Sequence, residues 1–167
     1  MDLSISEEQT ILSESVARFI SNDYLFENRM KIAESSEYFS KEYWKTYAEL
    51  GWTAVPFSED DGGLGGGPVE IMLMMKEFGR GLVIEPFLAN IILAGGILKR
   101  CASKEQKEKW LTKIIEGKLQ AALAFNEKQS GFNIANISTT AKKENGNFVL
   151  NGEKSLVLNG GRAELII

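Results

Sequence analysis

The sequence contains no histidine and a single cysteine, Cys101, among its 167 residues. A catalytic triad that depends on histidine, a zinc site built from histidine or from four cysteines, and an intramolecular disulfide are therefore excluded. Cys101 is interpreted as a small apolar residue of the core and not as a nucleophile, because the chain has no imidazole that would activate its thiol.

An excess of basic residues and long apolar runs are also missing. Nineteen Lys and Arg stand against 23 Asp and Glu, and the basic residues are scattered apart from the run Lys104–Lys113. A net charge of −4 with this distribution makes nucleic acid an unlikely partner. No apolar run reaches membrane-spanning length, and Met1–Ser4 lacks the basic and apolar regions of a signal peptide, so we expect a cytoplasmic protein without a membrane partner.

Glycine, by contrast, is concentrated in the stretch Pro56–Pro68, which holds five glycines within six residues. A phosphate-binding P-loop needs Lys and then Ser or Thr after its last glycine, whereas Pro68, Val69 and Glu70 follow here. The dinucleotide spacing also fails, and the acidic run Glu59–Asp61 would repel an anion. The stretch is therefore interpreted as a turn that leads into the next helix.

Helical signals dominate up to Gly117. Ser6–Gln9 and Ser103–Gln106 are capping boxes, and apolar residues recur at helical spacing after each of them. Three more helices are expected to start at Ser40, at Gly67-Pro68 and at Pro86. In the last of these helices, Ala94–Gly96 forms a flat patch that would admit either a neighbouring helix in close packing or a ligand chain.

After Gly117 the pattern changes to short extended runs. They are separated by Asn145-Gly146, Asn151-Gly152 and Asn159-Gly160, dipeptides that favour tight hairpin turns. The predicted fold class is α+β: an N-terminal all-α helical bundle in residues 1–118, followed by an incomplete antiparallel β domain in residues 119–167. The end Leu165–Ile167 is expected to be an unpaired apolar strand edge, which suggests that the chain is the N-terminal part of a longer protein.

Several motifs in this order resemble the acyl-CoA dehydrogenase family. They are Ser6–Gln9, Glu49–Trp52, Gly62–Gly65 and Asn151–Lys154. The stretches Pro56–Glu59 and Glu77–Pro86 look closest to the branch of the pimeloyl-CoA dehydrogenase small subunit, in which two unlike subunits pair. Single motifs are weak, but together they cover nearly the whole chain.

The resemblance implies oxidation of acyl-CoA thioesters to 2-enoyl-CoA with FAD as the cofactor. The family's two flavin-holding segments, Thr-Glu-Pro and Trp-Ile-Thr, fall on Asn126–Lys128 and Leu156–Leu158, so both depart from the pattern. The cofactor-binding candidates are Phe125, Asn126, Leu156 and Leu158. Asn126 keeps a polar amide, whereas Leu156 and Leu158 replace the indole wall and the hydroxyl donor.

By the same resemblance, the substrate-binding candidates are Ala89 and Leu93, beside the acyl chain, and Phe132, which replaces a serine near the thioester. No residue is assigned as catalytic, because the family's catalytic carboxylate lies in a C-terminal helical domain. Glu127 is interpreted as a surface or turn residue and not as a base. Two hypotheses remain open. In the first, the chain is a component that is inactive alone and pairs with a large dehydrogenase subunit acting on acyl-CoA. In the second, it is a non-catalytic scaffold that binds neither FAD nor CoA.

Overall fold

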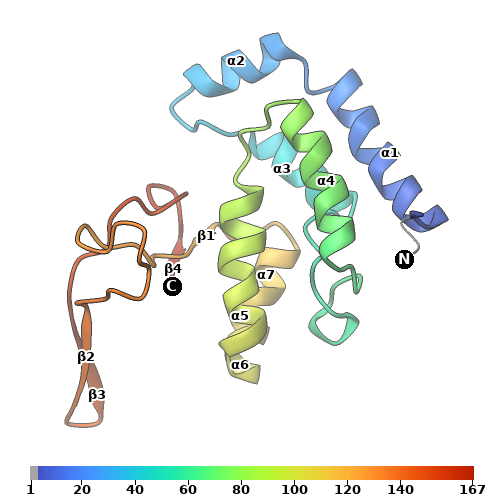
Figure 1. Cartoon of the computed structure of the whole chain (residues 1–167). Coiled ribbons are helices and arrows are strands. Elements are labelled where there is room, and N and C mark those ends of the chain that lie inside the picture. Colours follow the sequence, from blue (N-terminus) through green and yellow to red (C-terminus); the bar gives the residue numbers. More distant parts are fainter. Residues whose placement is uncertain (1–3) are drawn as a thin grey trace.

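The computed structural model describes residues 4–167 and consists of a helical part and a small β part (Figure 1). The predicted α+β fold class is confirmed. The first three residues of the predicted domain 1–118 lie outside the described residues. The helical elements are α1 (Glu7–Asn22), α2 (Phe26–Glu34), α3 (Lys41–Glu49), η1 (Glu59–Asp61), α4 (Pro68–Arg80), η2 (Phe87–Gly95), α5 (Gly96–Cys101), α6 (Lys104–Gln106), η3 (Lys107–Leu111) and α7 (Thr112–Ile115).

The predicted helix starts agree with the structure, because each depends on local hydrogen bonds. The Ser6 and Ser103 side chains accept hydrogen bonds from the backbone N–H groups three residues later. In both capping boxes the Gln side chain, of Gln9 or Gln106, accepts a second hydrogen bond from the backbone N–H of the serine. Ser40 caps α3, and Pro68 occupies the first position of α4. The helix expected from Pro86 is the continuous run of η2, a π-helix, into α5. Its last residue, Cys101, is exposed, so the predicted core position of this residue is wrong.

Helix α2 was not predicted. Its first turn has no side-chain cap, and none of its residues is fully buried. Neither a capping residue nor an apolar stripe therefore predicts this helix from the sequence. It lies across the end of the helical part opposite α6 (Figure 1). The loop after α2, which carries Tyr38 and Phe39, reaches the β part.

The core of the helical part is a chain of aromatic rings. Tyr47 stacks on Phe78 with ring centroids 5.3 Å apart, and Phe78 meets Phe87 edge-on at 5.2 Å. Phe19 of α1 meets Trp52 edge-on at 5.5 Å. Such ring pairs contribute roughly 0.5–1.5 kcal/mol each beyond their buried area. Helices α1, α3, α4 and η2 are thereby joined around one core.

The glycine-rich stretch folds onto itself and leaves no cradle for an anion. Backbone N–H groups of Gly63, Gly65 and Gly66 donate to carbonyl oxygens of Ser58, Phe57 and Val55 at 2.7–2.8 Å. A phosphate would need such N–H groups to be free. A Cβ atom at Gly63 would lie 2.3 Å from the Phe57 carbonyl oxygen, so the glycine is needed for this close backbone approach.

The small-residue patch of η2 is used for packing. Ala94 and Gly95 are buried, and a Cβ atom at Gly95 would lie 2.6 Å from the tip of the Phe57 ring. The space beside Gly95 is thus filled by an aromatic side chain from the glycine-rich stretch. Close packing explains this glycine, although the partner is a loop residue and not a neighbouring helix.

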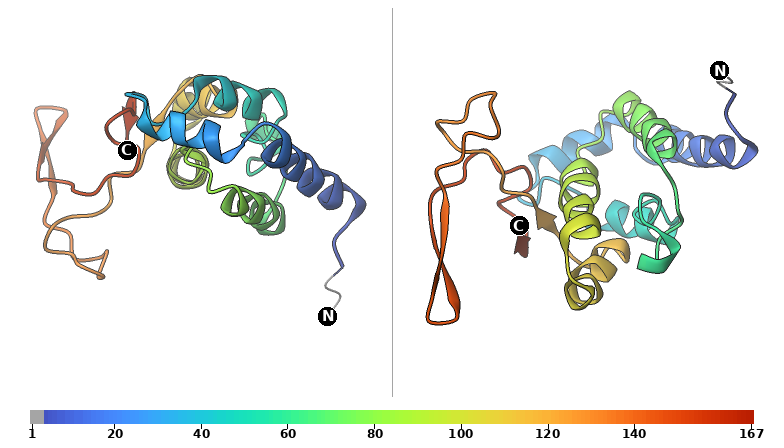
Figure 2. Two further views of the ribbon diagram at one scale, coloured as in Figure 1. Left: turned by 90° about the horizontal axis from the view of Figure 1, so that it is seen from above. Right: turned by 60° about the horizontal axis from the view of Figure 1, so that its bottom comes forward.

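The β part has one hairpin in place of the series expected from the Asn-Gly dipeptides. Strands β2 (Thr140–Glu144) and β3 (Asn147–Asn151) pair antiparallel around Asn145-Gly146, and both turn residues have positive φ. Gly152 follows β3 without a positive φ, and Ser155–Leu158 forms no strand. The hairpin extends away from the helices, and its residues are exposed (Figures 1 and 2).

Two predictions about Leu165–Ile167 are corrected. Strand β4 (Leu165–Ile166) is paired, with β1 (Ala121–Ala122) as its neighbour, and the pairing is parallel and not antiparallel. Ile167 extends this contact through hydrogen bonds with Ala122 and Ala124 at 2.9 and 2.7 Å. The local pattern identified the strand but could not reveal a partner more than forty residues earlier in the chain.

Candidate functional site

A hollow of about 430 Å³ lies where the helical part meets the β part. Its walls come from three segments: the loop after α2, the entry into η2, and the turn region before β4. We call it the junction pocket. It is lined by Tyr38, Phe39, Ile84, Glu85, Pro86, Leu88, Ala89, Val157, Leu158, Asn159, Gly160, Gly161 and Arg162.

Two of the predicted site residues meet in the junction pocket. Ala89, a substrate-binding candidate, is buried on η2, and Leu158, a cofactor-binding candidate, lines the same pocket with half of its surface exposed. Leu93 follows one turn further along η2 and does not line the pocket. Phe132 lies in a fully exposed turn outside it.

The two predicted flavin segments lie side by side near this pocket. Ser155 N donates to Asn126 O at 2.9 Å, which holds the second segment against the first. Phe125 and Leu156 are 41% and 84% exposed, and Leu158 is 53% exposed, so the pair of segments presents apolar side chains outward. The Asn126 side chain is partly engaged, since its Oδ1 accepts from Ser130 Oγ at 3.0 Å.

Glu127 is a buried structural carboxylate. Lys154 Nζ lies 2.7 Å from its Oε1, and Ser138 donates to Oε2 through both its N–H and its hydroxyl at 2.8 and 2.7 Å. Thr139 and Gln129 donate further hydrogen bonds to it. Lys154 above all, with Thr139 and Ser138, holds the pKa of Glu127 far below its ordinary value. A carboxylate held in this way does not act as a base. Its burial contradicts the predicted surface alternative, whereas the turn alternative agrees with the hydrogen bond that Ser130 N donates to Glu127 O at 3.0 Å.

A second buried carboxylate, Glu85, lies in the wall of the junction pocket, and no motif or spacing in the sequence pointed to it. Glu85 is 5% exposed, and Ser40 N donates to its Oε1 at 3.2 Å. Burial raises the pKa of its carboxyl above the ordinary value, although the Tyr24 hydroxyl and the Ser40 N–H favour the ionised form.

Arg162 also lines the junction pocket. Its guanidinium lies over the rings of Tyr38 and Phe39, 5.0 and 5.5 Å from their centroids, and its Nη2 donates to Ser36 O at 2.9 Å. Its Nη1 is buried and has no partner. Arg162 therefore ties the β part to the loop after α2 and leaves one charged N–H group unsatisfied beside the pocket.

Glu85→Gln is expected to stabilise the protein, and more so as the pH rises. The raised pKa means that the folded state retains the Glu85 proton above the ordinary value, so wild-type stability is lost as the pH rises through the folded-state pKa. The neutral amide avoids this loss, and a gain of about 1–3 kcal/mol is expected at pH 8. Urea unfolding of both proteins between pH 4 and 8 checks this; a difference that stays constant with pH contradicts it.

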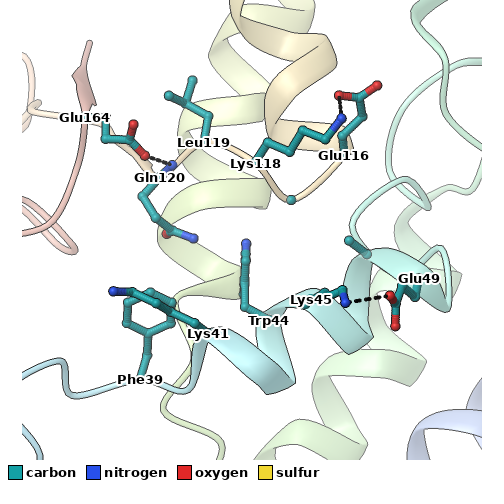
Figure 3. Close-up of a pocket in the computed structure, with 12 residues that line it drawn as sticks. Phe39, Lys41, Trp44, Lys45, Glu49, Glu116, Lys118, Leu119, Gln120 and Glu164 are labelled. Atoms are coloured by element: carbon teal, nitrogen blue, oxygen red, sulfur yellow. Dashed lines mark hydrogen bonds and ion pairs between the residues drawn. The ribbon is translucent and has the colours of Figure 1, made fainter.

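A second hollow of about 610 Å³ lies between α3 and the segment after α7 (Figure 3). None of the predicted site residues lines it. Its lysines Lys45 and Lys118 are paired with Glu49 and Glu116 at 3.5 and 3.0 Å. The balanced charges give this hollow no preference for an anion or a cation.

Among residues 4–167, no group of three or more Cys, Asp or Glu side chains is arranged to hold a metal ion. Within the same range, no helix combines the length and the apolar character that spanning a bilayer requires.

Comparison with known proteins places this geometry in a family. The family model "Acyl-CoA dehydrogenase, N-terminal domain" matches residues 6–118. Isovaleryl-CoA dehydrogenase of Pongo abelii is 33% identical over 98% of the chain and 39% of its own length. The solved FAD complex of PigA is 32% identical, with a TM-score of 0.86 over 100% of the chain and 44% of that structure.

A further structure shares the fold. The ChsE4-ChsE5 complex from Mycobacterium tuberculosis superposes with a TM-score of 0.88 at 22% identity, over 99% of this chain and 44% of that one. The chain thus spans about two fifths of the length of the relatives it matches. On the family match and these identities, the chain belongs to the acyl-CoA dehydrogenase family.

Proposed function

We propose that the chain contributes to an FAD-dependent oxidation of an acyl thioester to its 2-enoyl product. The observation that carries this proposal is the junction pocket, which is lined both by Ala89 of the helical part and by Leu158 of the β part. An acyl chain bound there would lie between the helical wall and the surface assigned to the flavin. Family membership supports the reaction class.

The residues present suit one aspect of flavin binding. The exposed apolar side chains of Phe125, Leu156 and Leu158 offer a surface on which a flat aromatic ring system would lose water contact. Asn126 supplies a polar group at the edge of this surface. When bound, FAD would supply the acceptor for the hydride that leaves the acyl group.

The chain's own contribution is binding and orientation. The hydrogen bond between Ser155 and Asn126 keeps the two flavin segments in contact, and Glu127 fixes the turn that follows the first of them. Glu127 is saturated with donors, so the base that removes the substrate proton is proposed to come from a region or subunit outside these residues. A large dehydrogenase subunit is the proposed partner, and a pairing of unlike chains has precedent in a structure of the same fold.

The second candidate is a scaffold subunit that binds neither FAD nor CoA. Leu156 and Leu158 favour it, because neither side chain can donate a hydrogen bond to the polar edge of a flavin. The names of the relatives include isovaleryl-CoA, acryloyl-CoA and an L-prolyl carrier protein, so acyl groups of different chemistry occur among them.

Flavin retention separates the two candidates. The chain alone is expected not to retain FAD with micromolar affinity in equilibrium dialysis, because its flavin surface lies open and lacks side-chain donors at two positions. The assembly purified from native cells is expected to show flavin absorbance. An assembly that is colourless and binds no added FAD would favour the scaffold, whereas micromolar binding by the chain alone would show that the flavin surface is already sufficient.

A further inference from the structure

A buried side-chain amide joins the helical part to the first strand of the β part. Asn90 lies on η2 and has no exposed surface. Its Oδ1 accepts a hydrogen bond from Ala121 N at 3.0 Å, and its Nδ2 donates to Leu119 O at 3.0 Å. Strand β4 bonds instead to the intervening carbonyl oxygens, those of Gln120 and Ala122. The Asn90 amide therefore takes the place of a neighbouring strand at the edge that β4 does not pair with, because it offers a donor and an acceptor together.

A second amide reaches the same segment from the β part. Asn159 Nδ2 donates to Ala121 O at 3.2 Å and to Gln120 Oε1 at 3.1 Å. Gln120 Oε1 also accepts from Asn90 Nδ2 at 3.3 Å, so one oxygen receives a hydrogen bond from each side. Asn159 has a φ of 63°, a left-handed conformation that asparagine adopts more often than most residues. We call Asn90, Gln120 and Asn159 the amide network.

Both ends of the amide network adjoin walls of the junction pocket. Ala89 directly precedes Asn90, Leu158 directly precedes Asn159, and Ala89, Leu158 and Asn159 all line the pocket. The hydrogen bonds that join Asn90 to Asn159 through Gln120 therefore also limit how far the two walls can separate. The helix that carries Ala89 and Asn90 is a π-helix, a form that is rare and occurs frequently at functional sites.

We propose that Asn90 and Asn159 are positioning residues of the junction pocket, which hold the wall at Ala89 and the wall at Leu158 in a fixed relation by binding the same strand edge and the same Gln120 oxygen. Walls that are already ordered lower the entropic cost of binding between them. This role rests on the proposed function, since it assumes that the pocket is used, but the fixed relation of the walls belongs to the chain alone and is measured without a ligand.

Residual dipolar couplings of backbone amides test this role, because they report how two parts of one molecule are oriented. In the wild-type chain, one alignment tensor is expected to describe both the helices and residues 157–167. Asn90→Leu leaves Leu119 O and Ala121 N without their partner, and residues 157–167 are then expected to need a second, weaker tensor. Hydrogen exchange of the Ala121 amide should become faster by at least about tenfold.

A second variant removes the amide at the other end of the network. Asn159→Gly keeps a residue that tolerates positive φ and loses only the side chain, so the same second tensor is expected. Asn159 is half-buried, so this variant carries the test if Asn90→Leu fails to fold.

Thr53→Val is the matched control, because it removes a buried hydrogen bond that lies wholly within the helical part. Thr53 has no exposed surface, and its Oγ1 donates to Ile115 O at 2.6 Å. This variant should lose stability but keep one tensor, and exchange of the Ala121 amide should stay within about twofold of wild type.

The outcomes separate this role from the proposed function. If the wild type already needs two tensors, or if one tensor describes both amide variants, the positioning role is wrong and the proposed function stands. A second tensor in Thr53→Val as well would also overturn it, because any loss of stability would then loosen the walls. A chain that shows the expected tensors but belongs to an assembly that binds no FAD would keep the fixed walls and lose the proposed reaction.

Discussion

Gly95→Ala is expected to lower the free energy of unfolding by about 1–3 kcal/mol, because the added methyl group would press against the buried Phe57 ring. The Cβ atom at this position would lie 2.6 Å from Phe57 Cζ and 3.1 Å from Cε1. Phe57 is itself only 1% exposed, so a shift of its ring would disturb the packing around it. For a chain of this size the midpoint of thermal unfolding should fall by several degrees.

The neighbouring residue provides the control. At Gly96 a Cβ atom would meet no atom within 4 Å, and the residue has helical φ and ψ. Gly96→Ala should therefore raise stability by up to about 1 kcal/mol through helix propensity. Thermal melts of both variants, and of Gly95→Ala combined with Phe57→Leu, would check the cause. Equal effects at the two glycines would show that the ring contact does not matter, and no recovery in the double variant would point to another source of strain.

The second large expected effect concerns the ion pair between Lys154 and Glu127, which lies at the predicted flavin segments. Lys154→Met is expected to lower the thermal midpoint by several degrees, because it leaves the Glu127 carboxylate buried without its cation. Its loss should loosen the turn that carries Ser138 and Thr139, whose N–H groups donate to Glu127. Hydrogen exchange of these two amides should become faster by at least about tenfold.

A neighbouring pair of the same chemistry provides the control. Lys128 and Glu153 lie 2.9 Å apart, but both side chains are more than two-thirds exposed. Lys128→Met should leave the midpoint unchanged within error, since exposed pairs contribute little. An equal fall of the thermal midpoint in the two variants would contradict this prediction, because it would mean that burial of Glu127 does not increase the contribution of its ion pair to stability. Because Lys154 lowers the Glu127 pKa, the stabilisation is fully present above the ordinary carboxyl pKa and declines progressively as the pH falls from that value towards the lower pKa of the folded state.

The sequence alone determined the features that depend on neighbours a few residues away. The capping boxes at Ser6 and Ser103 and the Asn145-Gly146 turn are local arrangements, and the structure forms them where the sequence predicts. The glycine stretch was excluded as a phosphate loop on spacing alone, and its internal hydrogen bonds give the same answer. The order of motifs also indicated the family, because each motif is short and continuous in the chain.

Only the tertiary structure decided what meets across long separations. Helix α2 has no cap or buried stripe, so its position depends on packing against the rest of the molecule. The parallel pairing of β1 with β4, the burial of Glu127 by Lys154, and the placement of Glu85 and Arg162 at one pocket each join residues from distant segments. Local propensity and periodicity carry no information about such contacts, because burial and charge pairing are set by how the segments pack and not by the residues on either side.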